Sequence, residues 1–135
     1  MNRILVSALL AAPIVALAAC QSGPKTPSSS TGKSASLRTM EQVAIAAHKC
    51  WFASKDSEFR TYRMANELNS FSGTPRFLLV PAENYGGKPL LVVQASGNSS
   101  EVEVFGPLMG EPLGARISAD VNRWRSGDNA CGAAG

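Results

Sequence analysis

Histidine and catalytic motifs are scarce in this sequence, and their scarcity limits the chemistry it can perform. The chain of 135 residues contains one histidine, His48, so any Ser-His or Cys-His catalyst would have to use it. No Gly-rich phosphate loop, HExxH, GxSxG or paired CxxC motif occurs. The sequence therefore predicts neither a cofactor nor a metal site, and a protein that is not an enzyme.

A large excess of charge of one sign is also missing. The 13 basic and 10 acidic side chains leave a formal net charge of +3. No run of lysine or arginine forms a basic patch along the chain, as nucleic-acid binding requires. The sequence therefore predicts no nucleic-acid partner.

The only long apolar segment lies at the N-terminus and is too short to span a bilayer. It runs from Ile4 to Leu17 after the single charge of Arg3, and it carries Pro13 near its centre. A spanning helix needs roughly 20 apolar residues. The segment instead has the three parts of a secretory signal peptide, which is removed from the mature protein.

The four residues that close this segment, Leu17-Ala18-Ala19-Cys20, resemble the lipobox of bacterial lipoproteins. This resemblance implies that residues 1–19 are removed and that Cys20 becomes the acylated first residue. The two or three acyl chains of such a residue anchor a protein permanently. An ordinary signal peptidase cut, leaving Cys20 as a free thiol, is the alternative. Gln21 follows in place of the aspartate that retains enteric lipoproteins at the inner membrane.

The resemblance to small Gram-negative outer-membrane lipoproteins, of alphaproteobacterial type, covers only the signal and the lipobox. It implies an outer-membrane anchor with the domain in the periplasm, or alternatively on the cell surface. Residues 20–36 are rich in Ser, Pro and Gly and predict a flexible tether with a span of about 20 to 25 Å. Residues 37–135 then form a single domain.

Two segments of this domain repeat apolar residues at spacings of three and four, the pattern of amphipathic helices. The first, expected over residues 37–53, has apolar positions at Leu37, Met40, Ala44, Ala47 and Trp51. The second, between Pro112 and Gly127, has them at Leu113, Ile117, Val121 and Trp124. On its opposite face, Arg116, Asp120 and Arg123 predict a solvated surface.

Four runs bounded by turn residues lie between these helices and predict strands over residues 59–65, 76–80, 90–95 and 102–105. Short connections favour antiparallel neighbours. The expected fold is α+β, an antiparallel four-stranded meander flanked in sequence by two helices, with both helices on one face. Two strands are apolar at every position. This leaves open one helix on each side, or a second face covered by the loop from Asn66 to Pro75, by a second copy or by another partner.

Cysteine usage predicts one disulfide. With Cys20 assigned to lipid, Cys50 and Cys131 remain in an exported chain, where thiols are normally paired. Closing a loop of about eighty residues stabilises a protein by roughly 4 to 5 kcal/mol in the chain-entropy model. A redox or metal site at His48 and Cys50 is the alternative, but it lacks the ligand count of a zinc site.

Two segments rich in turn formers carry candidate partner-binding residues: Phe71 and Arg76 in the first, Leu108 and Met109 in the second. In the alternative interpretation, Phe71, Leu108 and Met109 plug the ends of the core. Arg76 is expected to cluster with Arg60 and Arg63 if their strands are neighbours.

The expected function is that of a lipid-anchored envelope adaptor that binds a protein or glycan without catalysis. One alternative is a small hydrolase that uses His48, or Glu101 and Glu103 on one strand face about 7 Å apart. Another is a homodimer joined through the apolar sheet.

Overall fold

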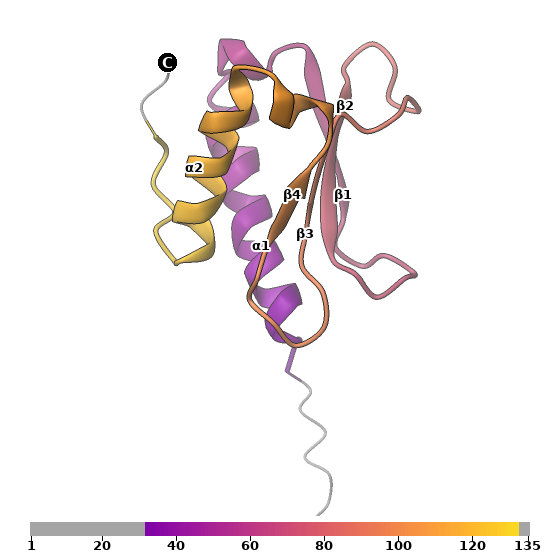
Figure 1. The fold of residues 1–135 in the computed structure, drawn as a ribbon, viewed down its shortest axis with the longest axis vertical. Helices are drawn as coiled ribbons and strands as arrows, with labels where there is room; N and C mark the ends of the chain where they lie inside the picture. Colours follow the sequence, from indigo (N-terminus) through magenta and orange to yellow (C-terminus); the bar gives the residue numbers. More distant parts are fainter. Residues whose placement is uncertain (1–31, 133–135) are drawn as a thin grey trace, which may run out of the picture. The chain divides into compact units, whose positions relative to one another are not determined.

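The computed structural model describes residues 32–132, which form a helix, one sheet of four antiparallel strands and a second helix (Figure 1). The elements are α1 (Ala35–Ala47), β1 (Tyr62–Glu67), β2 (Arg76–Pro81), β3 (Leu91–Gln94), β4 (Glu103–Phe105) and α2 (Leu113–Arg125). The predicted α+β meander is confirmed. The signal peptide, Cys20 and most of the expected tether lie outside the described residues.

The domain begins earlier than the sequence predicted. Ser34 caps α1, because its hydroxyl accepts a hydrogen bond from the backbone N–H of Leu37 at 3.2 Å. Ser36 is 1% exposed, and its hydroxyl donates to the carbonyl of Gly97 at 2.7 Å. The last residues of the expected tether are therefore the folded start of α1.

The expected helix over residues 37–53 is present, but its last six residues form a π-helical turn, His48–Ala53. Within this turn Cys50 and Trp51 are buried, whereas His48 and Lys49 are exposed. Lys55 follows with a positive φ of 58°, and its N–H donates to the carbonyl of Phe52 at 2.9 Å, which ends the helix.

The first strand was predicted too early. Phe59 belongs to a short 3-10 turn, Ser57–Phe59, and the strand starts only at Tyr62. The apolar character of Phe59 reflects a place in the core, where its ring stacks on Trp51 with centroids 4.5 Å apart. An isolated aromatic side chain is buried equally well by a turn and by a strand, so the sequence pattern could not separate them.

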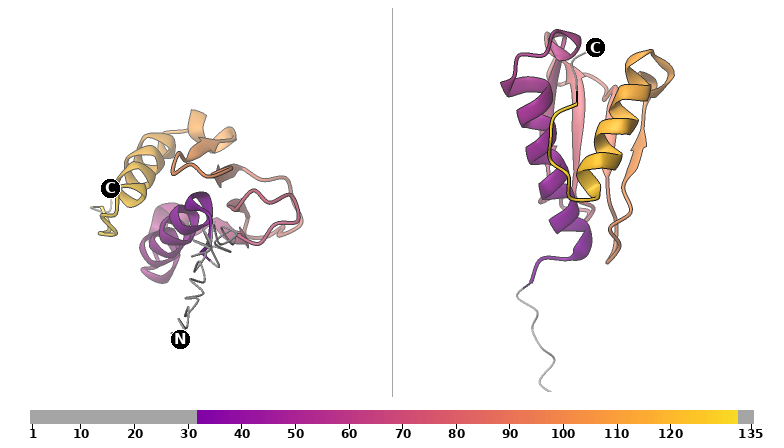
Figure 2. Two further views of the ribbon diagram at one scale, coloured as in Figure 1. Left: turned by 90° about the horizontal axis from the view of Figure 1, so that it is seen from below. Right: turned by 90° about the vertical axis from the view of Figure 1, so that its left-hand side faces the viewer.

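The four strands pair in sequence order, β1-β2-β3-β4. Both helices cover the same face of this sheet (Figures 1 and 2). The alternative with one helix on each side is therefore wrong, and no helix within residues 32–132 covers the opposite, open face (Figure 2). A row of apolar residues crosses that open face, as the strand register shows: Ala65, Leu78, Val92 and Phe105.

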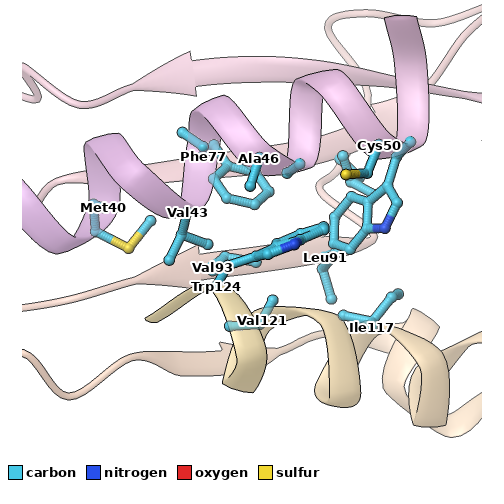
Figure 3. Packing of buried hydrophobic residues seen from close by; sticks show 14 of the residues in the cluster. Met40, Val43, Ala46, Cys50, Phe77, Leu91, Val93, Ile117, Val121 and Trp124 are labelled. Carbon is cyan, nitrogen blue, oxygen red and sulfur yellow. The ribbon is translucent and has the colours of Figure 1, made fainter. Parts of the chain in front are cut away.

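The core lies between the sheet and the two helices (Figure 3). The largest buried side chains are Trp51 from the π-helical turn and Trp124 from α2, whose rings lie 5.0 Å apart. Phe77 from β2 meets Trp51 edge to face at 6.4 Å. Each such aromatic pair adds about 0.5 to 1.5 kcal/mol beyond the burial of its area.

The predicted disulfide between Cys50 and Cys131 is confirmed. It joins the π-helical turn to the C-terminal segment that follows α2. The carbonyl of Ala130 in this segment accepts hydrogen bonds from the indole N–H of Trp124 at 3.0 Å and from Nε of Arg123 at 3.1 Å. The segment is thus held by a covalent bond and by α2.

Candidate functional site

A groove with a volume of about 550 Å³ lies between α1 and the edge strand β1. The α1 side is formed by Ala44, Ile45 and His48, and the strand side by Met64, Asn66 and Leu68. Lys33 and Glu41, joined by an ion pair of 2.7 Å, also line the groove. The groove therefore combines apolar walls with a few polar groups, as ligand sites commonly do.

Ile45 is the unusual residue of this groove. It is 69% exposed, although its neighbours Ala44 and Ala46 are buried. The same side chain lines a second hollow of about 470 Å³ together with Arg38 and Gln42. Ile45 therefore presents an apolar side chain to solvent beside two depressions.

The groove borders an open sheet edge. Among residues 32–132, β1 pairs with β2 only. The carbonyl of Thr61 accepts a hydrogen bond from the N–H of Ala82 at 2.8 Å, so Thr61 and Ala82 are a hydrogen-bonded pair. Hydrogen-bonded and non-hydrogen-bonded pairs alternate along two antiparallel strands. By that alternation, Tyr62, Met64 and Asn66 direct their backbone groups away from β2.

The two candidate binding residues of the first loop lie in different environments. Phe71 is fully exposed in the loop between β1 and β2. Arg76 lies at the start of β2, where its Nε donates to Oε2 of Glu67 at 2.6 Å. The register places Arg63 opposite Val80 and Arg76 opposite Glu67. Arg63 and Arg76 are therefore not opposite each other, and these two residues do not form the expected cluster of cations.

The two candidates of the second loop are placed differently from Phe71. Leu108 is 4% exposed and belongs to the core, and Met109 packs against that core while partly exposed. Both lie in a short 3-10 turn, Pro107–Gly110, next to α2. The prediction of Leu108 as an exposed anchor is wrong, because this turn directs it inward. The alternative interpretation, in which these side chains plug the ends of the core, fits Leu108 and Met109 but not Phe71.

The residues of the hydrolase alternative come from the π-helical turn, from β4 and from the loop before β4. His48 is exposed at the groove. Glu103 lies in β4 and accepts a hydrogen bond from Gln94 at 2.9 Å, whereas Glu101 precedes the strand and pairs with Arg125 at 3.3 Å. The expectation that Glu101 and Glu103 share one strand face is wrong, because β4 begins at Glu103.

A buried ionic network is the main feature that the sequence did not reveal. Asp120 on α2 is 2% exposed, not solvated as predicted. Its carboxylate accepts hydrogen bonds from the indole N–H of Trp51 at 2.8 Å and from Nη2 of Arg123 at 2.6 Å. Asp120 therefore ties α2 to the π-helical turn through the middle of the aromatic core.

Arg116 extends this network from α2 to the turn before β1. Its Nη2 donates to Oδ2 of Asp56 at 2.5 Å, its Nη1 donates to Glu58, and its guanidinium lies 5.3 Å from the ring centre of Phe59. Its Nε lies 3.7 Å from Oδ2 of Asp120. These charges are paired with one another, although the buried Nε of Arg116 makes no hydrogen bond, and the network joins α2 to the turn before β1.

The Arg116 guanidinium holds the pKa of Asp56 below its usual value, mainly by direct hydrogen bonding and against the opposing effect of burial. The carboxylates of Asp56 and Glu58 in turn raise the pKa of Arg116. Because the pKa of Asp56 is lower in the folded protein than the value of about 3.9 in an unfolded chain, protons favour the unfolded state.

The stabilisation by Asp56 is therefore expected to be complete above about pH 4 and to be lost as the pH falls through its lowered pKa. Urea unfolding of the protein and of an Asp56→Asn variant, at pH 7 and at pH 3, measures this effect. The difference between the two proteins should be large at pH 7 and smaller at pH 3. An equal difference at both pH values would show that Asp56 contributes nothing to the pH dependence.

Comparison of the chain with protein-family models, curated proteins and solved structures finds no match. Over residues 32–132, no helix has the length and hydropathy needed to cross a bilayer. The same residues contain no group of three His, Cys, Asp or Glu side chains placed to hold a metal ion.

Proposed function

We propose that this protein is a lipid-anchored adaptor of the bacterial envelope, which binds a protein partner at the groove between α1 and β1. The observation that carries the proposal is the exposed apolar side chain of Ile45 beside an open strand edge. An extended segment of a partner can bind such a surface by adding a strand to the edge and placing an apolar side chain in the groove.

The chemistry of the groove favours a polypeptide over a glycan. The backbone groups of Tyr62, Met64 and Asn66 offer the hydrogen bonds that another strand needs. Ile45 and Leu68 offer apolar surface for its side chains. None of the residues that line the groove is a Trp, Tyr or Phe, the side chains on which a sugar ring usually stacks.

The proposed membrane anchor is Cys20, in the sequence that resembles a lipobox. Lipid on its sulfur and amino group would keep the domain at the outer membrane on a permanent attachment. Mass spectrometry of the N-terminal peptide from purified membranes tests this step. An acylated peptide that begins at Cys20 is expected, whereas an unmodified peptide that begins elsewhere would remove the anchor from the proposal.

Crosslinking in intact cells, followed by mass spectrometry, tests the adaptor function. One envelope protein is expected to dominate the adducts of the anchored chain, and its yield is expected to fall in a Cys20→Ala variant that is no longer held at the membrane. A second variant, Ile45→Asp, keeps the anchor but places a charge in the groove. If its adducts equal those of the unchanged protein, the groove is not the binding surface.

A further inference from the structure

We infer that the strand which pairs with the open edge of β1 is β1 of a second copy of this chain, antiparallel to the first around a two-fold axis at Ala65. This inference rests on the proposed function, because it names the occupant of the same surface. The two edges of the sheet differ: β1 has six residues and β4 has three. No proline or lysine, the residues that commonly block pairing at an edge, lies within β1.

The hydrogen-bond alternation of β1 limits how two copies can pair. The residues with outward backbone groups, among them Met64 and Asn66, must face one another across the new interface. An antiparallel pair can therefore be centred on any residue from Tyr62 to Asn66. Of these registers, only the one centred on Ala65 places Arg63 opposite the partner's Glu67.

This register makes the interface complementary in charge. By symmetry it contains two Arg63–Glu67 pairs, one on each side of the axis. Both positions fall at non-hydrogen-bonded sites, where Cα atoms of opposite residues lie only about 4.5 Å apart and their side chains are closest. Opposite charges at such sites stabilise strand pairing, and like charges destabilise it.

The surroundings of the axis fit this arrangement. Ala65 meets its own copy there, and its small side chain allows close approach. Glu67 already accepts a hydrogen bond from Arg76 at Oε2, which leaves Oε1 for Arg63 of the partner subunit. The groove with Ile45 lies along the same edge, so a second copy would cover apolar surface that is exposed in one copy.

A cysteine at the axis tests the inference in the full-length chain at its membrane. In an Ala65→Cys variant the two new thiols would face each other in the oxidising envelope, so a covalent dimer is expected on a non-reducing gel. An Ala53→Cys variant, with an exposed cysteine in the π-helical turn and not in β1, is the matched control and should stay monomeric. Persistence of the Cys50–Cys131 bond in each variant shows that the domain has folded.

Charge reversal gives the sharper result. In the Ala65→Cys background, either Arg63→Glu or Glu67→Arg creates two pairs of like charges, and the yield of dimer is expected to fall about tenfold. Co-expression of these two variants under different tags restores opposite charges in the mixed dimer and should restore the mixed adduct. Arg60→Glu, which reverses a charge outside β1, should leave the yield unchanged.

Three outcomes would overturn the inference. The first is an Ala65→Cys variant that folds but dimerises no more than the Ala53→Cys control. The second is a yield unaffected by charge reversal. The third is a dimer linked through Leu78→Cys but not through Ala65→Cys, which would place the second copy on the open sheet face. If none of these variants dimerises while Ile45 still mediates crosslinks to another protein, the inference fails and the proposed adaptor function stands.

Discussion

Replacement of Asp120 by alanine is expected to lower the free energy of unfolding by about 3 to 5 kcal/mol, the usual cost of removing one partner from a buried ion pair. The variant leaves the indole N–H of Trp51 without its acceptor and leaves Arg123 without its carboxylate. Trp51 is 1% exposed and its indole cannot recover this interaction from water, whereas the side chain of Arg123 is 26% exposed and recovers part of its own.

Urea unfolding monitored by tryptophan fluorescence measures this loss, because Trp51 and Trp124 are the two tryptophans of the chain. An Asp120→Asn variant keeps an acceptor for Trp51 but loses the charge, so an intermediate loss is expected. Glu111→Ala, which removes an exposed carboxylate just before α2, is the control and should change stability by less than about 0.5 kcal/mol. If Asp120→Ala were as mild as this control, the network would not hold α2 to the π-helical turn.

Removal of the disulfide is the second change with a large expected effect. Cys50 and Cys131 lie 81 residues apart, and closing a loop of this length stabilises a protein by about 4 to 5 kcal/mol in the chain-entropy model. Reduction of the folded protein, and a Cys50→Ala/Cys131→Ala double variant, should both lower the urea midpoint. The variant should lose slightly more, because Cys50 is buried and its sulfur fills space in the core.

Hydrogen exchange of the same two samples reports on the C-terminal segment. Without the disulfide, this segment is held by the hydrogen bonds of Ala130 to Trp124 and Arg123 and by a contact from Lys49. Exchange of the indole N–H of Trp124, which donates to Ala130 of this segment, is expected to accelerate, while that of Trp51, which donates to Asp120, changes less. Unchanged midpoint and exchange in the reduced protein would show that packing alone holds the segment.

The sequence predicted the order of elements because its signals were local and strong. Apolar residues at helical spacing marked α1 and α2, and turn residues separated four short apolar runs. The disulfide followed from the count of cysteines in an exported chain. The start of the fold was missed because Ser34 and Ser36 look like tether residues, yet one caps α1 and the other binds the loop before β4.

The predictions for Asp120 and Leu108 were wrong because the spacing of residues in the sequence does not determine the direction in which each side chain points. Asp120 lies three residues before Arg123 and four after Arg116, a pattern typical of a solvated helix face. Asp120 is buried because its carboxylate pairs with Trp51, 69 positions away in the sequence, and no local pattern shows such a contact. Leu108 was assigned to a loop surface for the same reason, because a short 3-10 turn can present its apolar side chain to either side.

The groove was missed because it is a tertiary feature. Ile45 lies among apolar residues of the first helix, and the sequence pattern does not show that it is 69% exposed while Ala44 and Ala46 are buried. Only the register of β1 and its place at the edge show that Met64 and Leu68 come to lie beside it. The exposed apolar residue and the open edge together distinguish this surface from the rest of the domain.

A photo-reactive amino acid at position 45, in the anchored chain in living cells, tests the central claim most directly. The same substitution at Tyr85, an exposed residue of the loop between β2 and β3, is the control. The proposed binding surface predicts protein adducts from position 45 and few from position 85. An adduct with a second copy of the chain would support the dimer as well. Equal yields from both positions, or none from position 45, would contradict the account.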